Sequence, residues 1–168
     1  MLTVKKFNNI SDIIYKHLDN MELADRIAGE MVKDKPAAVF VDAGGGAGVI
    51  DRLKQLGHYV TEIPFGSKPV KPGRFVNRRM EMWQNMADWL KGGGALPPIE
   101  ALKAELSLPT YSFNNNGLLQ LERKEDIKER LMRSPDLADA LCLTFAAPVT
   151  AHPDQIRRAP KPYDPLAW

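Results

Sequence analysis

The stretch AAVFVDAGGGAGVIDRLKQLGHYVTEI, residues 37–63, decides the fold. It begins with an apolar run that ends in the carboxylate of Asp42, which is typical of a buried strand with a functional group at its carboxyl end. Glycines follow within 44–48, then apolar residues at helical spacing over 49–57, then a second extended segment at 59–63. This order predicts a strand, a glycine turn, a helix and a parallel second strand, and therefore an α/β fold.

Further elements are expected on both sides of this unit. Upstream, the pattern predicts strands at 2–7 and 13–18 around a turn at Asn8-Asn9, then a capping box at 19–22 and a helix to about Lys33. Downstream, it predicts a loop at 64–74, a helix from Asn77 to about Leu90, a short helix near 98–106, a hairpin at 111–121, a helix from Lys124 to Leu131, and a last helix capped by Ser134 with Pro135 at its first position.

The 168 residues are expected to form one domain over 1–147, followed by a proline-rich extended tail at 148–168. Cys142 is the one cysteine, so no internal disulfide is possible, and its apolar neighbours predict a buried thiol. No apolar stretch approaches the roughly 20 residues of a membrane span, and the N-terminus lacks a signal-peptide core. We therefore expect a soluble, cytosolic protein that makes no membrane contact.

Basic residues gather in two places, although the net charge of +2 is too small to indicate nucleic-acid binding by itself. The two groups are Lys68, Lys71, Arg74, Arg78 and Arg79, and Lys124, Lys128, Arg130 and Arg133. Charge runs of this kind are more often solvated faces than binding sites. Contact with the phosphates of a nucleic acid is the alternative that these positions leave open.

Asp42 is the first candidate for chemistry, because the carboxyl end of a parallel strand faces the crevice where α/β proteins bind ligands. An aspartate that serves only the turn or the helix cap is the alternative. The glycines within 44–48 are also suited to holding a phosphate at a helix start. They lack the Lys-Ser/Thr of a Walker A loop and do not fit G-x-G-x-x-G, so a phosphate- or nucleotide-binding module is kept as an alternative function.

Asp136 and Asp139 are the second candidate, because residues three apart on a helix share a face. Acidic residues are common at helix starts, where the dipole favours them, and this is the alternative explanation. Asp139 lies in an otherwise small, apolar stretch, where a carboxylate is costly without a cation partner. Carboxylates that meet at one point form a hard-oxygen site for Mg²⁺ or Mn²⁺. The three histidines are scattered and show no zinc-binding spacing.

Three segments in this order resemble the nuclease domain of phage terminase large subunits. They are VDAGGGAGVIDRL at 41–53, NRRMEMW at 77–83, and a closing region that begins LERKEDIK at 121 and ends SPDLADAL at 141. The D-x-x-D-A-L ending is also similar to that of RuvC-type Holliday-junction resolvases. The resemblance covers about residues 10–148, which is nearly the whole chain.

This resemblance implies an RNase H-like fold, a mixed sheet flanked by helices. It implies a metal-dependent endonuclease, using two Mg²⁺ or Mn²⁺ ions, that cuts concatemeric phage DNA during genome packaging in the bacterial host cytoplasm. By resemblance, the catalytic and metal-binding residues are Asp42, Asp136 and Asp139. The residues expected near double-stranded DNA are Lys68, Lys71, Arg74, Arg78, Arg79, Lys124 and Lys128. The implied partners are the terminase ATPase domain, the small terminase subunit and the portal.

The sequence departs from the family pattern in two ways. It contains no Walker A loop, and no early residue matches the first catalytic aspartate, because neither Asp12 nor Asp19 ends an apolar strand. The fold is therefore expected to lack its first central strand, and the site one carboxylate. An active nuclease completed by another chain is one hypothesis. An inactive prophage remnant or fragment that binds DNA or packaging partners is the other, because a two-metal site without its bridging carboxylate should lose most of its activity.

Overall fold

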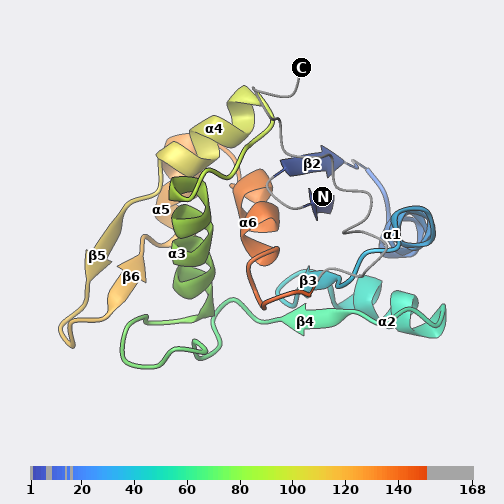
Figure 1. Cartoon of the computed structure of the whole chain (residues 1–168), viewed down its shortest axis with the longest axis horizontal. Coiled ribbons are helices and arrows are strands. Elements are labelled where there is room, and N and C mark those ends of the chain that lie inside the picture. The colour runs from blue at the N-terminus through green and yellow to red at the C-terminus, as the bar shows by residue number, and fades with distance from the viewer. Residues whose placement is uncertain (1, 7–8, 14, 16, 151–168) are drawn as a thin grey trace, which may run out of the picture.

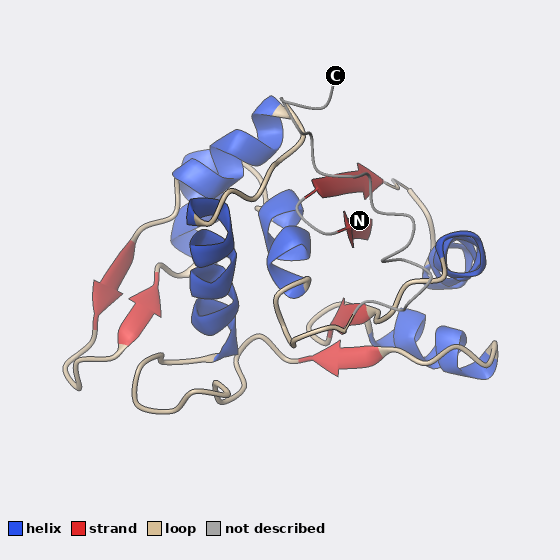
Figure 2. Cartoon of the chain, in the orientation of Figure 1, coloured by secondary structure: helices blue, strands red, loops and turns tan. Residues whose placement is uncertain are grey.

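The computed structural model describes residues 2–6, 9–13, 15 and 17–150 (Figure 1). In chain order the elements are β1 (Leu2–Lys6), β2 (Asn9–Ile13), α1 (Asn20–Asp34), β3 (Phe40–Asp42), α2 (Ala47–Gln55), β4 (Thr61–Ile63), α3 (Arg78–Lys91), α4 (Glu100–Ser107), β5 (Tyr111–Phe113), β6 (Leu119–Leu121), α5 (Lys124–Leu131) and α6 (Asp136–Leu143). The described strands pair two by two, β1 with β2, β3 with β4 and β5 with β6 (Figure 2). Within this part of the chain, no helix is long and apolar enough to cross a membrane.

The predicted strand–helix–strand unit is confirmed. β3 and β4 run parallel, with Asp42 opposite Ile63, and α2 connects them. α1 packs against α2, and the two helices share a core with the strands that contains Ala24, Ile27, Val49, Ile50, Leu53 and Val60. β3 is shorter than the predicted strand and only half-buried, because β4 is its one neighbour among the described strands. This agrees with the expectation of a sheet without its central strand.

α6 occupies the centre of the molecule. It contacts α3 and α4 on one side and β1 and β3 on the other, so it joins the larger helical part to the strand–helix–strand unit (Figure 1). Its buried face contributes to the main hydrophobic core, which contains Ile63, Met82, Trp83, Met86, Leu102, Leu137, Ala138, Leu141, Cys142 and Ala146. Cys142 is free and buried, as predicted. Any acid on α6 is therefore held by packing on several sides.

The start of α6 differs from the prediction. Pro135, not Ser134, is the N-cap residue, and it provides no side-chain cap. Instead the fully buried carboxylate of Glu105, on α4, accepts a hydrogen bond of 2.9 Å from the backbone N–H of Ala138. Arg133 Nη1 lies 2.6 Å from the other oxygen of Glu105. The local capping pattern favours Ser134, but such a pattern cannot reveal a cap supplied from a distant helix.

Most other boundaries agree with the sequence. Asp19 forms the predicted capping box with Glu22, and Asn77 caps α3 by accepting from Met80 N. The N-terminal hairpin is present, but the second strand at 13–18 was wrong. β2 lies at Asn9–Ile13 because pairing with Leu2–Lys6 sets its position, and the extended propensity of the following residues does not. Most of the predicted tail, residues 151–168, lies outside the described residues.

The cap on α6 makes stability depend on pH in a defined direction. Burial raises the pKa of Glu105, against the opposing effects of the Ala138 N–H and Arg133. The folded state therefore binds the Glu105 proton more tightly than the unfolded state does. The unfolding free energy of the wild-type chain should increase, relative to Glu105→Gln, as pH falls from about 7 through this raised pKa.

Urea denaturation of both proteins at several pH values measures the difference between their unfolding free energies. The other titrating groups are the same in both proteins, so their contributions cancel in this difference. Glu100→Gln is the matched control, because Glu100 lies on the same helix with its side chain 88% exposed. That variant should follow the wild-type curve. A Glu105→Gln difference that does not change with pH would contradict the assignment.

Candidate functional site

Asp42 is fixed by the glycine turn that follows β3. The backbone N–H of Gly44 donates to its Oδ1 at 3.0 Å, and the N–H of Gly46 donates to its backbone carbonyl at 3.0 Å. A Cβ at position 46 would lie 2.5 Å from the Asp42 carbonyl oxygen and 2.6 Å from Val41 Cγ1, so only glycine fits there. The turn therefore holds the carboxylate at the carboxyl end of the strand through one oxygen.

A cavity of about 560 Å³ opens in front of this carboxylate. Its walls come from the ends of β3 and β4 and from two helices: Asp42, Ala43, Gly44, Pro64, Phe65, Gly66, Arg79, Lys124 and Lys128. The cavity lies where α/β proteins bind ligands, at the carboxyl ends of parallel strands. Three cations face one carboxylate in this lining, which favours an anionic ligand. Four of the residues selected from the sequence thus meet in one place.

Asp139 does not line the cavity itself, but its carboxylate is paired with two of the cations that do. The carboxylate is 6% exposed, and its Oδ1 accepts from Arg79 Nε at 3.3 Å and Nη2 at 3.2 Å. Lys124 Nζ lies 2.7 Å from its Oδ2. The cation partner that a buried carboxylate requires is therefore present twice. Arg79 also lies over the ring of Trp83, 5.9 Å from the ring centroid, which fixes the guanidinium further.

Asp136 lies elsewhere on α6. It is exposed in the first turn and belongs to the surroundings of Glu105, whose pKa it helps to raise after the larger effect of burial. The described residues contain no group of three or more Asp, Glu, His or Cys side chains that could hold a metal ion. Asp42 therefore lines the cavity, Asp139 is paired with two of the cations that line it, and Asp136 lies on the side of α4.

Cys142 is fully buried on α6, one turn after Asp139. Burial raises the pKa of its thiol well above the ordinary value, and the charge of Asp139 raises it further. Asp42 acts in the same direction, while Arg79 and Arg78 oppose it. The thiol is therefore neutral, and Cys142 belongs to the main hydrophobic core.

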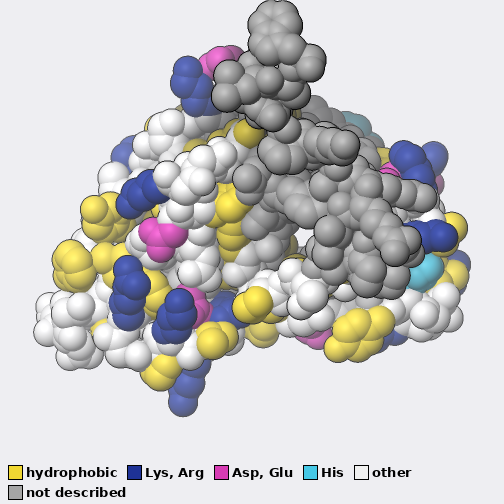
Figure 3. All heavy atoms as spheres, viewed as in Figure 1, with side chains coloured by type: hydrophobic (Ala, Val, Ile, Leu, Met, Phe, Trp, Pro, Cys, Tyr) yellow, Lys and Arg dark blue, Asp and Glu magenta, His cyan; other side chains and the backbone are white. Residues whose placement is uncertain are grey.

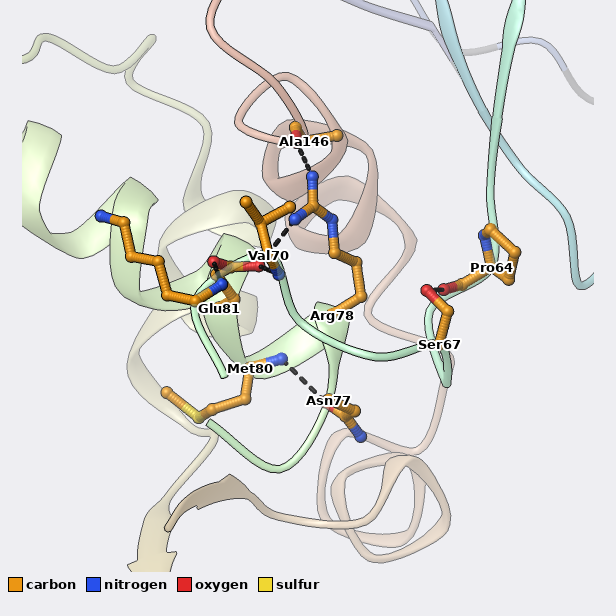
Figure 4. Close-up of polar contacts among 9 residues, drawn as sticks. Pro64, Ser67, Val70, Asn77, Arg78, Met80, Glu81 and Ala146 are labelled. Carbon is orange, nitrogen blue, oxygen red and sulfur yellow. Dashed lines mark hydrogen bonds and ion pairs between the residues drawn. The ribbon is translucent and has the colours of Figure 1, made fainter. Parts of the chain in front are cut away.

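The predicted DNA-contacting residues fall into three sets, of which Lys124 and Lys128 line the cavity. Lys68, Lys71 and Arg74 are exposed on the loop between β4 and α3, on a side of the molecule where Figure 3 shows several Lys and Arg side chains. Arg78 and Arg79 point inward. Arg78 Nη1 lies 2.6 Å from Glu81, and its Nη2 donates to the backbone carbonyl of Ala146 (Figure 4).

Glu81 is a buried residue that the sequence analysis passed over. Its carboxylate is 2% exposed and accepts from the backbone N–H groups of Val70 at 2.7 Å and Lys71 at 2.9 Å (Figure 4). Burial alone would raise its pKa, but these two N–H groups and Arg78 outweigh burial and lower the pKa. The signal available was a glutamate among the apolar residues Met80, Met82 and Trp83, where a charge needs partners.

No family model matches the chain, and no curated protein matches it. The nuclease domain of the large terminase subunit gp2 of bacterial virus Sf6 superposes with a TM-score of 0.71 at 23% identity, covering 88% of this chain and 81% of that chain. A point mutant of that domain solved with manganese gives a TM-score of 0.71 at 24% identity, covering 87% and 82%.

A further point-mutant structure of that subunit, solved with calcium, gives a TM-score of 0.66 at 24% identity, covering 84% of this chain and 78% of the other. This chain has the fold of a terminase nuclease domain. The RNase H-like fold expected from the three sequence segments is therefore confirmed.

The glycine turn gives a sharp test of how Asp42 is held. Gly46→Ala should lower the unfolding free energy by about 1–3 kcal/mol, the usual cost of forcing extra volume into a packed site. Gly45→Ala is the matched control, because a Cβ there meets no atom within 4 Å. It should leave the urea midpoint nearly unchanged. Equal midpoints for the two variants would contradict the close approach at position 46.

The pair between Arg79 and Asp139 gives a second test. Arg79→Met should destabilise the chain by up to about 3 kcal/mol, the lower end for a broken buried pair, because Lys124 still faces the carboxylate. Adding Asp139→Asn should recover part of that loss, since the unpaired charge is then removed. Thermal and urea unfolding of the two single variants and the double variant measure the coupling. Strictly additive losses would show that the pair contributes nothing.

Proposed function

We propose that this chain is the nuclease domain of a phage terminase large subunit, a metal-dependent endonuclease that cuts double-stranded DNA during genome packaging. One observation carries the proposal. On this fold, the cavity at the carboxyl ends of two parallel strands combines the carboxylate of Asp42 with the cations Arg79, Lys124 and Lys128. A phosphodiester needs both kinds of group, cations for its oxygens and a carboxylate that holds a metal.

The side chains present fit a divalent ion of the Mg²⁺ or Mn²⁺ type. Such ions are held by one or two carboxylates and complete their shell with water and substrate phosphate oxygens. Asp42 is the carboxylate in the cavity that would hold it, and Asp139 would join it only when Lys124 leaves its Oδ2. When bound, the ion would polarise a phosphoryl oxygen and activate a water molecule. Lys124 and Lys128 would orient the phosphate at the cavity, and Arg79 would keep Asp139 in place.

The wider setting follows from the same resemblance. The solved relative is the nuclease domain of a large terminase subunit. We propose that this chain likewise works in the bacterial host cytoplasm with a terminase ATPase domain, a small terminase subunit and a portal. A first-strand carboxylate from a neighbouring segment or chain would complete a two-metal site beside β3, which has β4 alone as its neighbour in the described part of the chain.

A second candidate is a DNA-binding protein that does not cut. The charges of the site favour it, because Asp139 is engaged by Arg79 and Lys124 and no third carboxylate joins Asp42 among the described residues. The nucleotide-binding alternative is disfavoured by the glycine turn. The N–H groups of Gly44 and Gly46 are occupied by Asp42, so the turn does not offer them to a phosphate.

Plasmid cleavage separates the two candidates. The purified chain should nick or linearise plasmid DNA with Mn²⁺ and lose this activity in EDTA. Asp42→Ala should reduce the rate at least about 100-fold, the upper range for losing even an outer-shell partner of a metal site. Asp51→Ala, an exposed aspartate on α2, should cut at the wild-type rate.

Absence of cutting together with DNA retention that weakens as salt increases would establish the second candidate. Absence of both cutting and retention would exclude both candidates. Cutting that persists in Asp42→Ala would mean that the carboxylate of Asp42 is not the metal ligand.

A further inference from the structure

The loop between β4 and α3, residues 64–77, is fixed at both of its ends. At its start, Ser67 Oγ donates to the Pro64 carbonyl at 2.7 Å (Figure 4). Arg78 N donates to the Ser67 carbonyl at 2.8 Å. At its end, Val76 N donates to the Leu119 carbonyl at 3.0 Å, and Leu119 N donates back to the Arg74 carbonyl at 2.9 Å. A loop rich in Pro, Gly and Lys is thereby tied to a helix and to β6.

Glu81 fixes the middle of the same loop. Its side chain reaches back from α3 and accepts two consecutive backbone N–H groups, those of Val70 and Lys71. Arg78 donates to the same carboxylate and also to the carbonyl of Ala146, just beyond the end of α6. Charge-assisted hydrogen bonds of this kind are about twice as strong as neutral ones. One buried carboxylate thus connects the loop, α3 and the segment after α6.

The fixed backbone presents three exposed cations. Lys68, Lys71 and Arg74 are exposed, with Arg74 lying over the ring of Phe75, whereas the neighbouring Arg78 and Arg79 are paired with buried carboxylates. The loop begins at the cavity, because its first three residues, Pro64, Phe65 and Gly66, line the cavity. A backbone held at three places keeps its exposed cations at set spacings, so less conformational entropy is lost when they bind a regularly spaced polyanion.

We propose that Glu81 is a positioning residue for nucleic acid, holding Lys68, Lys71 and Arg74 as a phosphate-binding ledge beside the Asp42 cavity. This inference rests on the proposed function and deepens it, since it assigns the DNA backbone to one side of the site. The ledge binds phosphates without sequence preference, because its lysine and arginine side chains contact the phosphate groups of the backbone and not the edges of the bases.

A charged carboxylate at position 81 is essential to this arrangement. Both of its oxygens accept, so Val70 N, Lys71 N and Arg78 are satisfied together. A glutamine keeps one accepting oxygen but presents an NH₂ group to the remaining donors. Glu81→Gln should therefore release the loop at nearly constant side-chain volume, with the three cations of the ledge left intact.

The test measures binding of the full chain to a short DNA duplex by fluorescence anisotropy in EDTA, over a range of salt concentrations. Each phosphate contact contributes about 0.9 to the slope of log K against log salt. Glu81→Gln should lower that slope by roughly 2, the loss of two to three contacts. Glu62→Gln, an exposed glutamate on β4, should keep the wild-type slope.

Combination with the ledge residues separates positioning from general stability. Lys68→Ala with Lys71→Ala should lower the slope in the wild-type chain and cause little further loss in Glu81→Gln. A destabilised but correctly shaped loop would instead show two independent, additive losses, and this would overturn the proposal. A wild-type slope in folded Glu81→Gln would overturn it as well. If the wild-type chain does not bind DNA, the proposed function itself fails, and this inference fails with it.

Hydrogen exchange on the unmodified chain covers the case in which Glu81→Gln does not fold. The amides of Val70 and Lys71 should exchange much more slowly than the amide of Gly73, in the same loop, and should remain slow when DNA is added. Exchange of all three at unprotected rates would show that the carboxylate does not hold the loop, and the proposal would be wrong.

Discussion

The buried carboxylate of Asp139 is the constraint on which the rest of the structure depends. It lies on the central helix α6, and a charge in that position requires compensation. Arg79 from α3 and Lys124 from α5 supply it, so three helices are brought together by one charge cluster. Because these two cations also line the cavity, the packing of the core and the charge of the site are set by the same contacts.

The local elements could be predicted because each carries its own signal. The apolar run before Asp42, the glycines after it and the cap at Asp19 depend on neighbours within a few residues, and all three were confirmed in place. The exposure of β3 could not be predicted in this way. Whether an apolar strand is buried depends on how many strands pair with it, and the described part of the chain provides β4 alone.

Several residues of the cavity lining were selected from the sequence, but the partners of their side chains were not. Asp42, Arg79 and Lys124 were all selected from the sequence, yet the cations were assigned to DNA and the acids to metal as separate groups. The fold instead pairs Arg79 and Lys124 with Asp139. Glu81 and Glu105 were passed over, because their partners lie about ten and thirty residues away along the chain. Long-range pairs of this kind leave no periodic signal in a single sequence.

Charge connects the proposed metal site to the proposed DNA ledge. The cations Arg79, Lys124 and Lys128 outnumber the carboxylates of Asp42 and Asp139, so a divalent ion entering alone would meet a net positive surrounding. A phosphate backbone on Lys68, Lys71 and Arg74 would bring negative charge to the same rim and would make metal binding more favourable. By linkage, bound metal would then strengthen DNA binding by the same factor. On this argument the site is best suited to metal and DNA together, which fits a nuclease that acts only on its loaded substrate.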